Sequence, residues 1–382
     1  MIYKHKLMCG IVSTLLQVFP EKWVPGEGYV KQAVKNTTPL ECGRMLELFP
    51  EELQSLAIEN GLQAYRGRQV FGWLHKKRVY DLDVMTNLPR DFRNTLKKAL
   101  PLMPVRRMEA FSSGDGTKKI HLSLVPGETI ETVIMQGDDS AVSVCISTQV
   151  GCPVGCIFCR SGSRGLKRNL SASEIIAQVY AAMDETGPDR LSGIVFMGSG
   201  DPLLNLDASV RALKILTHPD GNGISCRKIT LSTVGIPSGM KRLANLLDGP
   251  VSLAVSLHAP DDETRRRLVP GVKAGVREIV ESIRKFPVPA GRRITVEYVL
   301  IKGINDRPDQ AQRLADLLKG LKVKVKVNLL PLNPHDATDL SPPSTQRVHA
   351  FQKILTDRGM LVFIRKRRGH DQLAACGQLL SW

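Results

Sequence analysis

From residue 137 onward, apolar residues recur in short runs that alternate with amphipathic segments of helical length. The buried strand candidates are Ser143–Thr148, Gly193–Gly198, Lys228–Thr233, Val251–His258, Arg293–Leu300 and Lys324–Pro331. The helix candidates between them include Ser173–Asp184, Ser209–Leu216, Val276–Lys285 and Ala311–Leu318. Strands that alternate with helices predict an α/β fold with a parallel sheet.

The six strand–helix units are too few for a closed eight-stranded barrel. A partial (β/α)6 TIM-like barrel over residues 137–370 is therefore favoured over an open doubly wound sheet. Either architecture places a functional site at the carboxyl ends of the strands.

The residues before the barrel follow two other patterns. Residues 39–104 have apolar positions at helical spacing, such as Leu53 and Ala57, which predict a small helical domain. Residues 105–136 alternate and are interrupted by Gly114-Asp-Gly116 and Pro126-Gly127, which indicates a β-hairpin or meander that links the two domains. Residues 1–38 are an extension of unknown order, and residues 371–382 form a separate C-terminal segment.

The charge of the chain indicates the kind of partner it binds: the net charge is +16 and the pI is near 9.6. Between Asn60 and Arg107 there are 11 Lys or Arg and only three acidic residues. This balance favours nucleic acid as a partner, and the helical domain as an RNA-binding domain. The alternative is that the positive charge reflects only a generally basic proteome and no specific partner. The aromatic residues there, Tyr65, Phe71, Trp73 and Tyr80, are interpreted as core.

No run of about 18 apolar residues is present, so no membrane span is expected. Eight cysteines in 382 residues, three of them clustered, do not resemble a secreted disulfide framework. They favour a reducing compartment, and the cytoplasm is the expected location.

Three cysteines, Cys152, Cys156 and Cys159, lie at the spacing C-x3-C-x2-C. One such loop can supply three thiolates to a 4Fe-4S cubane and leave the fourth iron without a protein ligand. A zinc knuckle or a group of disulfides are the alternatives. Zinc sites favour C-x2-C pairs with four ligands, and no second pair follows nearby.

Polar residues also follow the other predicted strands. Gly200-Asp201 comes after the second strand, Ser232 after the third, Ser256-Leu257-His258 after the fourth and Asn333 after the sixth. Each alone is typical of a residue that caps a helix or turn. Together they converge on the strand ends where the cysteine loop lies.

The cysteine loop within such a barrel resembles the radical SAM superfamily. The resemblance implies that S-adenosylmethionine chelates the open iron and yields a 5′-deoxyadenosyl radical. It further implies that Gly200 and Asp201 hold the methionine amino group. Contacts to the nucleoside or carboxylate are expected from Ser232, Ser256, Leu257, His258 and Asn333.

Two further segments point to one family within this superfamily. They are Cys145-Ile-Ser-Thr-Gln-Val-Gly-Cys152 and Ala374-Ala-Cys376-Gly-Gln-Leu379, and they resemble motifs of the RlmN/Cfr family of RNA adenosine methyltransferases. The similarity extends from about Pro39 to Leu379. It implies two molecules of S-adenosylmethionine per turnover and three catalytic residues. Cys376 accepts a methyl group, Cys145 closes a transient disulfide with it, and Glu131 serves as a proton acceptor.

The expected activity is methylation of carbon 2 of an adenosine in 23S rRNA, with tRNA as a further substrate. The alternatives are a Cfr-type reaction at carbon 8 and a divergent RNA-binding relative with weakened catalysis. The expected partners also include an electron donor such as flavodoxin or ferredoxin, and the chain is expected to be a monomer.

The chain departs from the family pattern at Asp201, where Glu is usual, at Arg160 after the cluster loop, and at Gly271–Gly275. These departures indicate a divergent branch. Cys9, Cys42 and Cys226 have no accompanying motif and are interpreted as structural thiols.

Overall fold

The computed structural model describes residues 43–381 apart from 125–126, 138–139, 248 and 322. The extension at residues 1–38, together with Cys9 and Cys42, lies outside the described residues. Within the described ranges, no helix combines the length and the apolar character that a membrane span requires.

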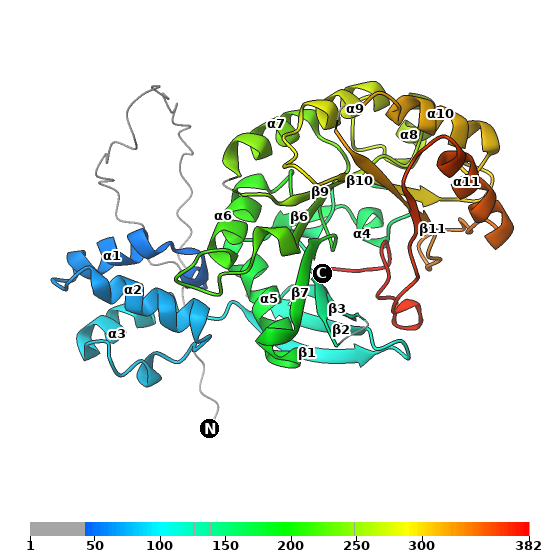
Figure 1. Ribbon diagram of the computed structural model, residues 1–382. Coiled ribbons are helices and arrows are strands. Elements are labelled where there is room, and N and C mark those ends of the chain that lie inside the picture. Colours follow the sequence, from blue (N-terminus) through cyan, green and yellow to red (C-terminus); the bar gives the residue numbers. More distant parts are fainter. Residues whose placement is uncertain (1–42, 125–126, 138–139, 248, 322, 382) are drawn as a thin grey trace, which may run out of the picture. The chain divides into compact units, whose positions relative to one another are not determined.

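One ten-stranded sheet forms the centre of the described structure (Figure 1). The strands are β1 (Val105–Ser112), β2 (Lys118–Leu124), β3 (Thr129–Gln136), β4 (Val142–Cys145), β7 (Leu191–Phe196), β8 (Ile229–Thr233), β9 (Ser252–Ser256), β10 (Ile294–Leu300), β11 (Val325–Pro331) and β12 (Val362–Ile364), in that spatial order. Strands β1 to β4 pair antiparallel, whereas β4 and β7 to β12 pair parallel. The predicted α/β fold with a partial barrel is therefore confirmed.

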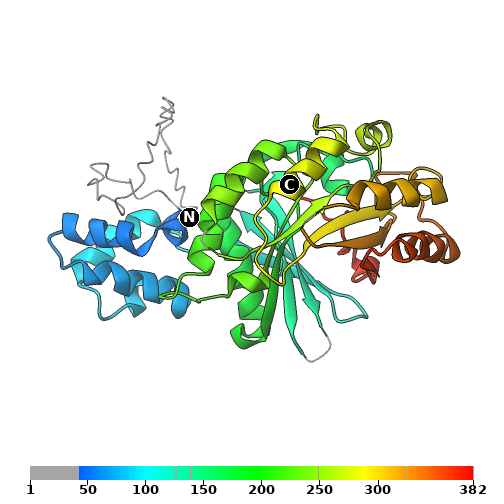
Figure 2. The same cartoon turned by 45° about the horizontal axis from the view of Figure 1, so that its top comes forward.

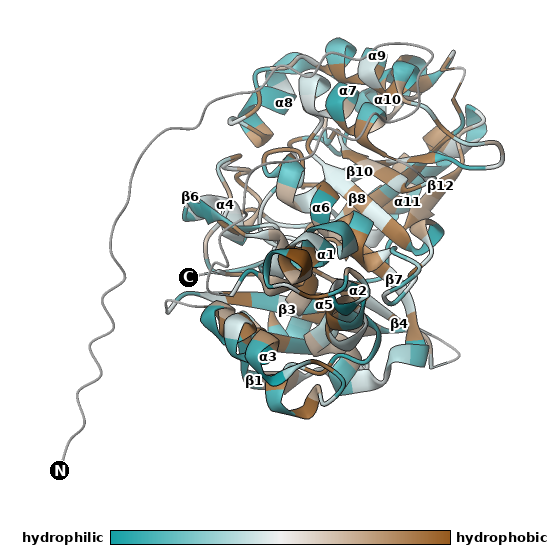
Figure 3. Ribbon diagram, turned by 90° about the vertical axis from the view of Figure 1, so that its left-hand side faces the viewer, coloured by the Kyte–Doolittle hydropathy of each residue, from teal (hydrophilic) through white to brown (hydrophobic). Residues whose placement is uncertain are grey.

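The main helices follow the parallel strands and cover the outer side of the sheet (Figure 2). They are α5 (Ala172–Thr186), α6 (Leu206–Leu216), α7 (Pro237–Leu246), α8 (Asp262–Leu268), α9 (Val276–Lys285), α10 (Pro308–Leu318) and α11 (Thr345–Asp357). The short helix α4 (Arg160–Ser163) instead follows the cysteine loop directly. Helix α9 illustrates how apolar residues at helical spacing predict a helix with one buried face. Its buried residues, which lie on one face, are Val276, Ile279, Val280 and Ile283. Figure 3 shows hydrophilic and hydrophobic residues mixed along α7, α9 and α10, as expected for helices with one buried face.

Two small elements differ from the sequence expectation. Strand β12 adds a seventh parallel strand, but it has only three residues and its Phe363 is 48% exposed, so no buried run predicts it. Strands β5 (Gln149–Gly151) and β6 (Leu166–Asn169) form a separate hairpin around the cysteine loop.

The N-terminal helices are α1 (Pro50–Glu59), α2 (Tyr65–Phe71) and α3 (Arg90–Leu96). Phe71 is fully buried, Trp73 and Tyr80 pack against the core, and Tyr65 is half exposed. His75 anchors these helices to the barrel, because its Nδ1 lies 2.7 Å from the hydroxyl of Tyr180 on α5. Burial lowers the pKa of His75 to about 3, so the ring is neutral and needs this partner.

We expect Tyr180→Phe to lower the free energy of unfolding by about 1–3 kcal/mol, because it leaves the buried His75 ring unpaired. Chemical denaturation monitored by circular dichroism measures the change. Tyr65→Phe is the matched control on an exposed tyrosine and should stay within about 0.5 kcal/mol of the parent protein. Equal stability of the two variants would contradict this anchoring role.

Candidate active site

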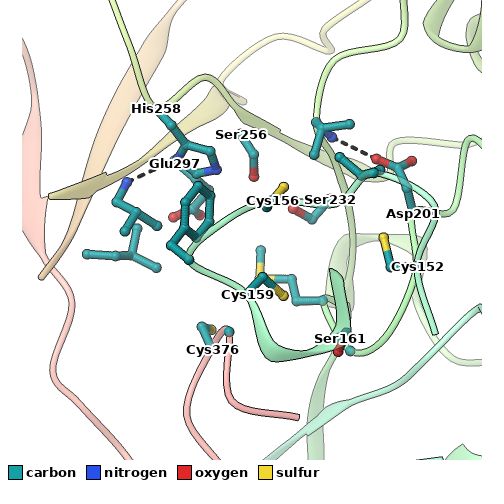
Figure 4. Close-up of a pocket in the computed structure, with 18 of the residues that line it drawn as sticks. Cys152, Cys156, Cys159, Ser161, Asp201, Ser232, Ser256, His258, Glu297 and Cys376 are labelled. Atoms are coloured by element: carbon teal, nitrogen blue, oxygen red, sulfur yellow. Dashed lines mark hydrogen bonds between the residues drawn. The ribbon is translucent and has the colours of Figure 1, made fainter. Parts of the chain in front are cut away.

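The loops after the parallel strands enclose a cavity at the carboxyl edge of the sheet, here called the cluster pocket (Figure 4). The predicted residues that line it are Cys152, Cys156, Cys159, Gly200, Asp201, Ser232, Ser256, His258, Asn333 and Cys376. Leu257 and Glu131, which were also predicted, are not among the lining residues. Parallel pairing thus brings together residues that lie up to 224 positions apart, from Cys152 to Cys376.

The cysteine loop is held in place by backbone contacts on both sides. The amide of Cys152 donates to the carbonyl of Gly165 at 2.9 Å, and the amide of Gly271 donates to the carbonyl of Val154 at 2.8 Å. A Cβ atom on Gly151 would lie 2.0 Å from the Gly165 oxygen, and one on Gly271 would lie 2.5 Å from the Val154 oxygen. Both positions therefore require glycine. The divergent Gly271 has a structural role against the cysteine loop.

The three thiols are held within a largely apolar shell. Val154, Phe158 and Leu332 belong to one buried cluster, against which the three cysteines pack. Burial raises the pKa of Cys152 to about 12 and raises the pKa of Cys156 as well, with the neighbouring thiols adding to the effect. Such thiols become ligands only when a cation stabilises their thiolate forms.

This arrangement fits an iron–sulfur cubane better than a single ion. Among the described residues, no three His, Cys, Asp or Glu side chains converge closely enough to hold one metal ion. In a cubane each cysteine binds a different iron, so the thiols need not meet at one point. Figure 4 shows the three cysteines spread around the same cavity.

Asp201 is buried and its carboxylate is occupied by the protein itself. One oxygen accepts the amide of Leu203 at 2.8 Å; the other accepts the Thr233 hydroxyl at 2.9 Å and the Val234 amide at 2.7 Å. Burial raises the pKa of Asp201 to about 6, and these hydrogen bonds oppose the rise. Asp201 therefore ties the loop after β7 to the loop after β8, a link that its sequence motif does not reveal.

His258 and Leu257 follow β9 but have different surroundings. The Nδ1 atom of His258 accepts the amide of Val299 at 3.1 Å, and the ring packs edge-on against Phe158 with 4.9 Å between the ring centroids. Burial, aided by the charge of Arg265, lowers the pKa of His258 to about 3, so the ring is neutral. Leu257 is completely buried, and its amide donates to the carbonyl of Glu297.

A second cavity, here called the thiol pocket, contains Cys145 and Cys376 together. It shares Met197, Leu330, Pro331, Asn333 and Cys376 with the cluster pocket. Its opposite end is lined by Lys366, Arg367 and Arg368, which also line a third, polar hollow with Asp115 and Gln136. The three cavities therefore lie in series, and the two cysteines occupy the middle one.

The environment of the two thiols differs. Burial raises the pKa of Cys145 to about 12, with Cys376 adding to the rise. Cys376 is accessible from the cavity, although the surrounding protein raises its pKa too. Arg365 also lines the thiol pocket, and its charge opposes both shifts.

Residues 374–381, here called the C-terminal strap, carry Cys376 to the pocket mouth. The amide group of Asn333 donates to the carbonyl of Cys376 at 3.0 Å, and that of Gln378 donates to the carbonyl of Pro334 at 2.7 Å. The backbone amide of Arg160 donates to the carbonyl of Gly377 at 2.7 Å. These bonds fix the strap to the loop after β11 and to the end of the cysteine loop.

Glu131 lies under the strap, outside both pockets. One carboxylate oxygen lies 3.1 Å from Lys119 Nζ and 2.8 Å from His121 Nε2, and the other accepts the amide of Leu380 at 2.8 Å. Its predicted role as a proton acceptor stays a prediction; the contacts observed are those of an anchor for the strap.

Glu297 is a pocket residue that no sequence motif indicates. Glu297 is 4% exposed and lines the cluster pocket. One carboxylate oxygen accepts from Asn328 at 2.9 Å and lies 3.9 Å from Arg365, whereas the other is buried and has no hydrogen-bond partner among the described residues. An acidic residue inside the apolar run Ile294–Leu300 is the signal that could have identified it. Cys226 lines neither pocket.

We expect Asp201→Ala to lower the free energy of unfolding by more than about 2 kcal/mol, because it leaves three donors without their acceptor. Thermal unfolding of the cofactor-free protein measures this. Asp207→Ala, which removes an 83% exposed carboxylate on α6, is the control and should change little. A protein that keeps its stability without Asp201 would show that this carboxylate does not link the loops.

Comparisons with known proteins agree with the fold and extend it. The model of the radical SAM superfamily matches residues 146–318, and that of the ribosomal RNA large subunit methyltransferase N-terminal domain matches residues 44–101. A radical SAM methyltransferase from Sphaerobacter thermophilus has a crystal structure with a TM-score of 0.82. It is 41% identical and covers 87% of this chain and 98% of its own.

Curated relatives match over most of the chain. A dual-specificity RNA methyltransferase RlmN from Sorangium cellulosum is 43% identical, over 87% of this chain and 94% of that protein. A probable dual-specificity RNA methyltransferase RlmN from Thermotoga neapolitana is 44% identical, over 88% of this chain and 96% of that protein.

Proposed function

The chain belongs to the RlmN family of radical SAM RNA methyltransferases, and from this premise we propose that it methylates carbon 2 of an adenosine in 23S rRNA, with tRNA as a second substrate. The observation that carries the proposal is the thiol pocket. It places Cys145 and Cys376 in one cavity between the cluster pocket and a basic opening.

Cys152, Cys156 and Cys159 would hold a 4Fe-4S cluster, and Ser232, Ser256, His258 and Asn333 would contact S-adenosylmethionine in the same pocket. When bound, these groups would supply a methyl group and a 5′-deoxyadenosyl radical. The partnerless oxygen of Glu297 adds an acceptor for the cofactor in this pocket.

Cys376 would be the methyl acceptor. Carbon 2 of adenine is electron-poor and does not attack a sulfonium methyl, whereas a thiolate does. The charge of Arg365 favours the thiolate form of Cys376. Because Cys376 lines both pockets, it can take the methyl group in the cluster pocket and present it to the RNA in the thiol pocket. Two molecules of S-adenosylmethionine are then consumed per turnover.

Cys145 would release the product. When the methylene carbon has bonded to the ring, and the adduct has lost the ring proton and has passed its unpaired electron to the electron-donor couple, the thiol of Cys145 gives up its proton and forms an S–S bond with Cys376. The C–S bond breaks with its electron pair on carbon, and this carbon takes up a proton and becomes the methyl group. Reduction of that disulfide restores the two thiols, which fits a reducing cytoplasm. The cluster would receive its electron from a donor such as flavodoxin or ferredoxin.

The basic opening supports RNA as the substrate. Lys366 and Arg367 are exposed where the thiol pocket reaches the surface. An adenine has to leave its stack to enter such a cavity, and cationic side chains at the entrance hold the flanking phosphates.

Mass spectrometry of nucleosides from RNA treated with the reconstituted enzyme tests the proposal. We expect 2-methyladenosine; 8-methyladenosine would instead assign the reaction to carbon 8. An intact cluster with neither product, and no cleavage of S-adenosylmethionine, would indicate an RNA-binding relative with weakened catalysis.

The two working cysteines give separable outcomes. Cys376→Ala should abolish methyl transfer to both protein and RNA, whereas Cys145→Ala should accumulate a covalent protein–RNA adduct, seen by denaturing gel and intact mass. Cys226→Ala, which alters a half-buried thiol outside both pockets, should behave as the parent enzyme. Methylated RNA from the Cys376 variant would refute the assigned acceptor.

Lys366→Gln should weaken RNA binding and reduce the slope of log Kd against log salt concentration by roughly one. Filter binding of an rRNA fragment measures it. Lys353→Gln, on the exposed face of α11, is the control with the same change of charge. Identical slopes for the two variants would exclude Lys366 from phosphate contact.

A further inference from the structure

A chain of three buried serine hydroxyls joins the strap to the cluster loop and to the sheet. The hydroxyl of Ser381 donates to Ser199 Oγ at 2.6 Å, Ser199 Oγ lies 3.0 Å from Ser161 Oγ, and Ser161 donates to the carbonyl of Leu379 at 2.7 Å. All three side chains are at most 4% exposed. The chain therefore begins and ends on the strap and passes through two fixed points on the barrel.

The direction of the hydrogen bonds leaves no hydroxyl unsatisfied. Each serine has one proton to give. If Ser381 donates to Ser199 and Ser161 donates to Leu379, the Ser199 proton is the one that bridges to Ser161. Removing any member leaves a buried donor or acceptor without its partner, so the three act as one unit.

Ser199 is bonded to the barrel through its backbone, and Ser161 belongs to a short helix next to the cysteine loop. The amide of Ser199 donates to Ser147 Oγ at 3.0 Å, and its carbonyl accepts the amides of Thr148 and Gln149. Ser161 lies on α4, two residues after Cys159. A strap bound to these two residues is therefore positioned against both the end of β7 and the cluster loop.

Among the described residues, the strap has little apolar contact. Ala374 and Leu379 belong to a small buried cluster with Val133 and Cys145, and Ala375 is the other buried apolar residue of the strap. The polar anchors, with the Leu380 amide on Glu131 among them, therefore decide how firmly the strap docks.

We propose that Ser161, Ser199 and Ser381 form a latch that docks the C-terminal strap and thereby positions Cys376 between the cluster pocket and the thiol pocket. The three serines are positioning residues that act through Cys376, and this part of the inference rests on the proposed function. Docking of the strap itself does not depend on it.

Two variants on different elements, Ser199→Ala and Ser381→Ala, test the latch in the reconstituted enzyme. Ser163→Ala is the matched control, because Ser163 is on the same helix as Ser161 but donates only to the carbonyl of Arg160. Hydrogen–deuterium exchange of the strap reports docking, and single-turnover methylation of Cys376 reports positioning. Iron content confirms that each variant retains the cluster.

In both latch variants we expect exchange of the Leu380 amide to accelerate roughly fivefold, the effect of losing about one hydrogen bond, and methylation of Cys376 to slow by a similar factor. Ser163→Ala should change neither rate. Ser381→Thr, which keeps the hydroxyl, should restore most of both.

Unchanged strap exchange in both latch variants would overturn the proposal. Faster exchange with normal methylation of Cys376 would overturn its positioning part. If the parent enzyme itself transfers no methyl group while the latch variants still exchange faster, the proposed function fails and the docking role stands. Should Ser199→Ala not fold, Ser381→Ala with its threonine counterpart decides the question.

Discussion

Parallel pairing of the strands is the constraint on which the site depends. Because β4 and β7 to β12 all run in one direction, each must end at the same edge of the sheet, and the loop after each is forced into a shared space. This edge brings together residues that are far apart in the sequence, namely the cysteine loop, Asp201, His258 and Asn333. Hydrogen bonds between loops then refine this convergence; Asp201 joins two loops and Asn333 holds the strap.

The sequence predicts the features whose signal is local. The periodicity of Val276–Lys285 defines α9 to the residue, and the spacing of Cys152, Cys156 and Cys159 identifies the pocket before any geometry is known. Features that depend on distant partners could not be foreseen. Asp201 is bonded to residues 32 and 33 positions away, and Glu131 is engaged by a strap residue 249 positions away. Strand β12 is too short to produce a pattern, and it is recognisable only by its pairing with β11.

The positive charge of the chain is divided between structural and surface roles. Arg265 is fully buried and binds the carbonyls of Ser256, Leu257 and Val234, and Arg168 lies between Glu128 and Glu174. Such residues contribute to the net charge of +16, but their guanidinium groups are bound to other parts of the protein. Lys366 and Arg367, by contrast, are exposed at the mouth of a cavity. Position, more than total charge, distinguishes the residues available to RNA.

The strap follows its partners in the chain, so it is synthesised after them. These partners include Glu131, Ser161, Ser199 and Asn333, and a ribosome exposes them before residues 374–381 emerge. The barrel can therefore fold with its mouth open and the cysteine loop reachable from outside. The strap that carries Cys376 can then close over pockets whose lining residues outside the strap all precede it in the chain.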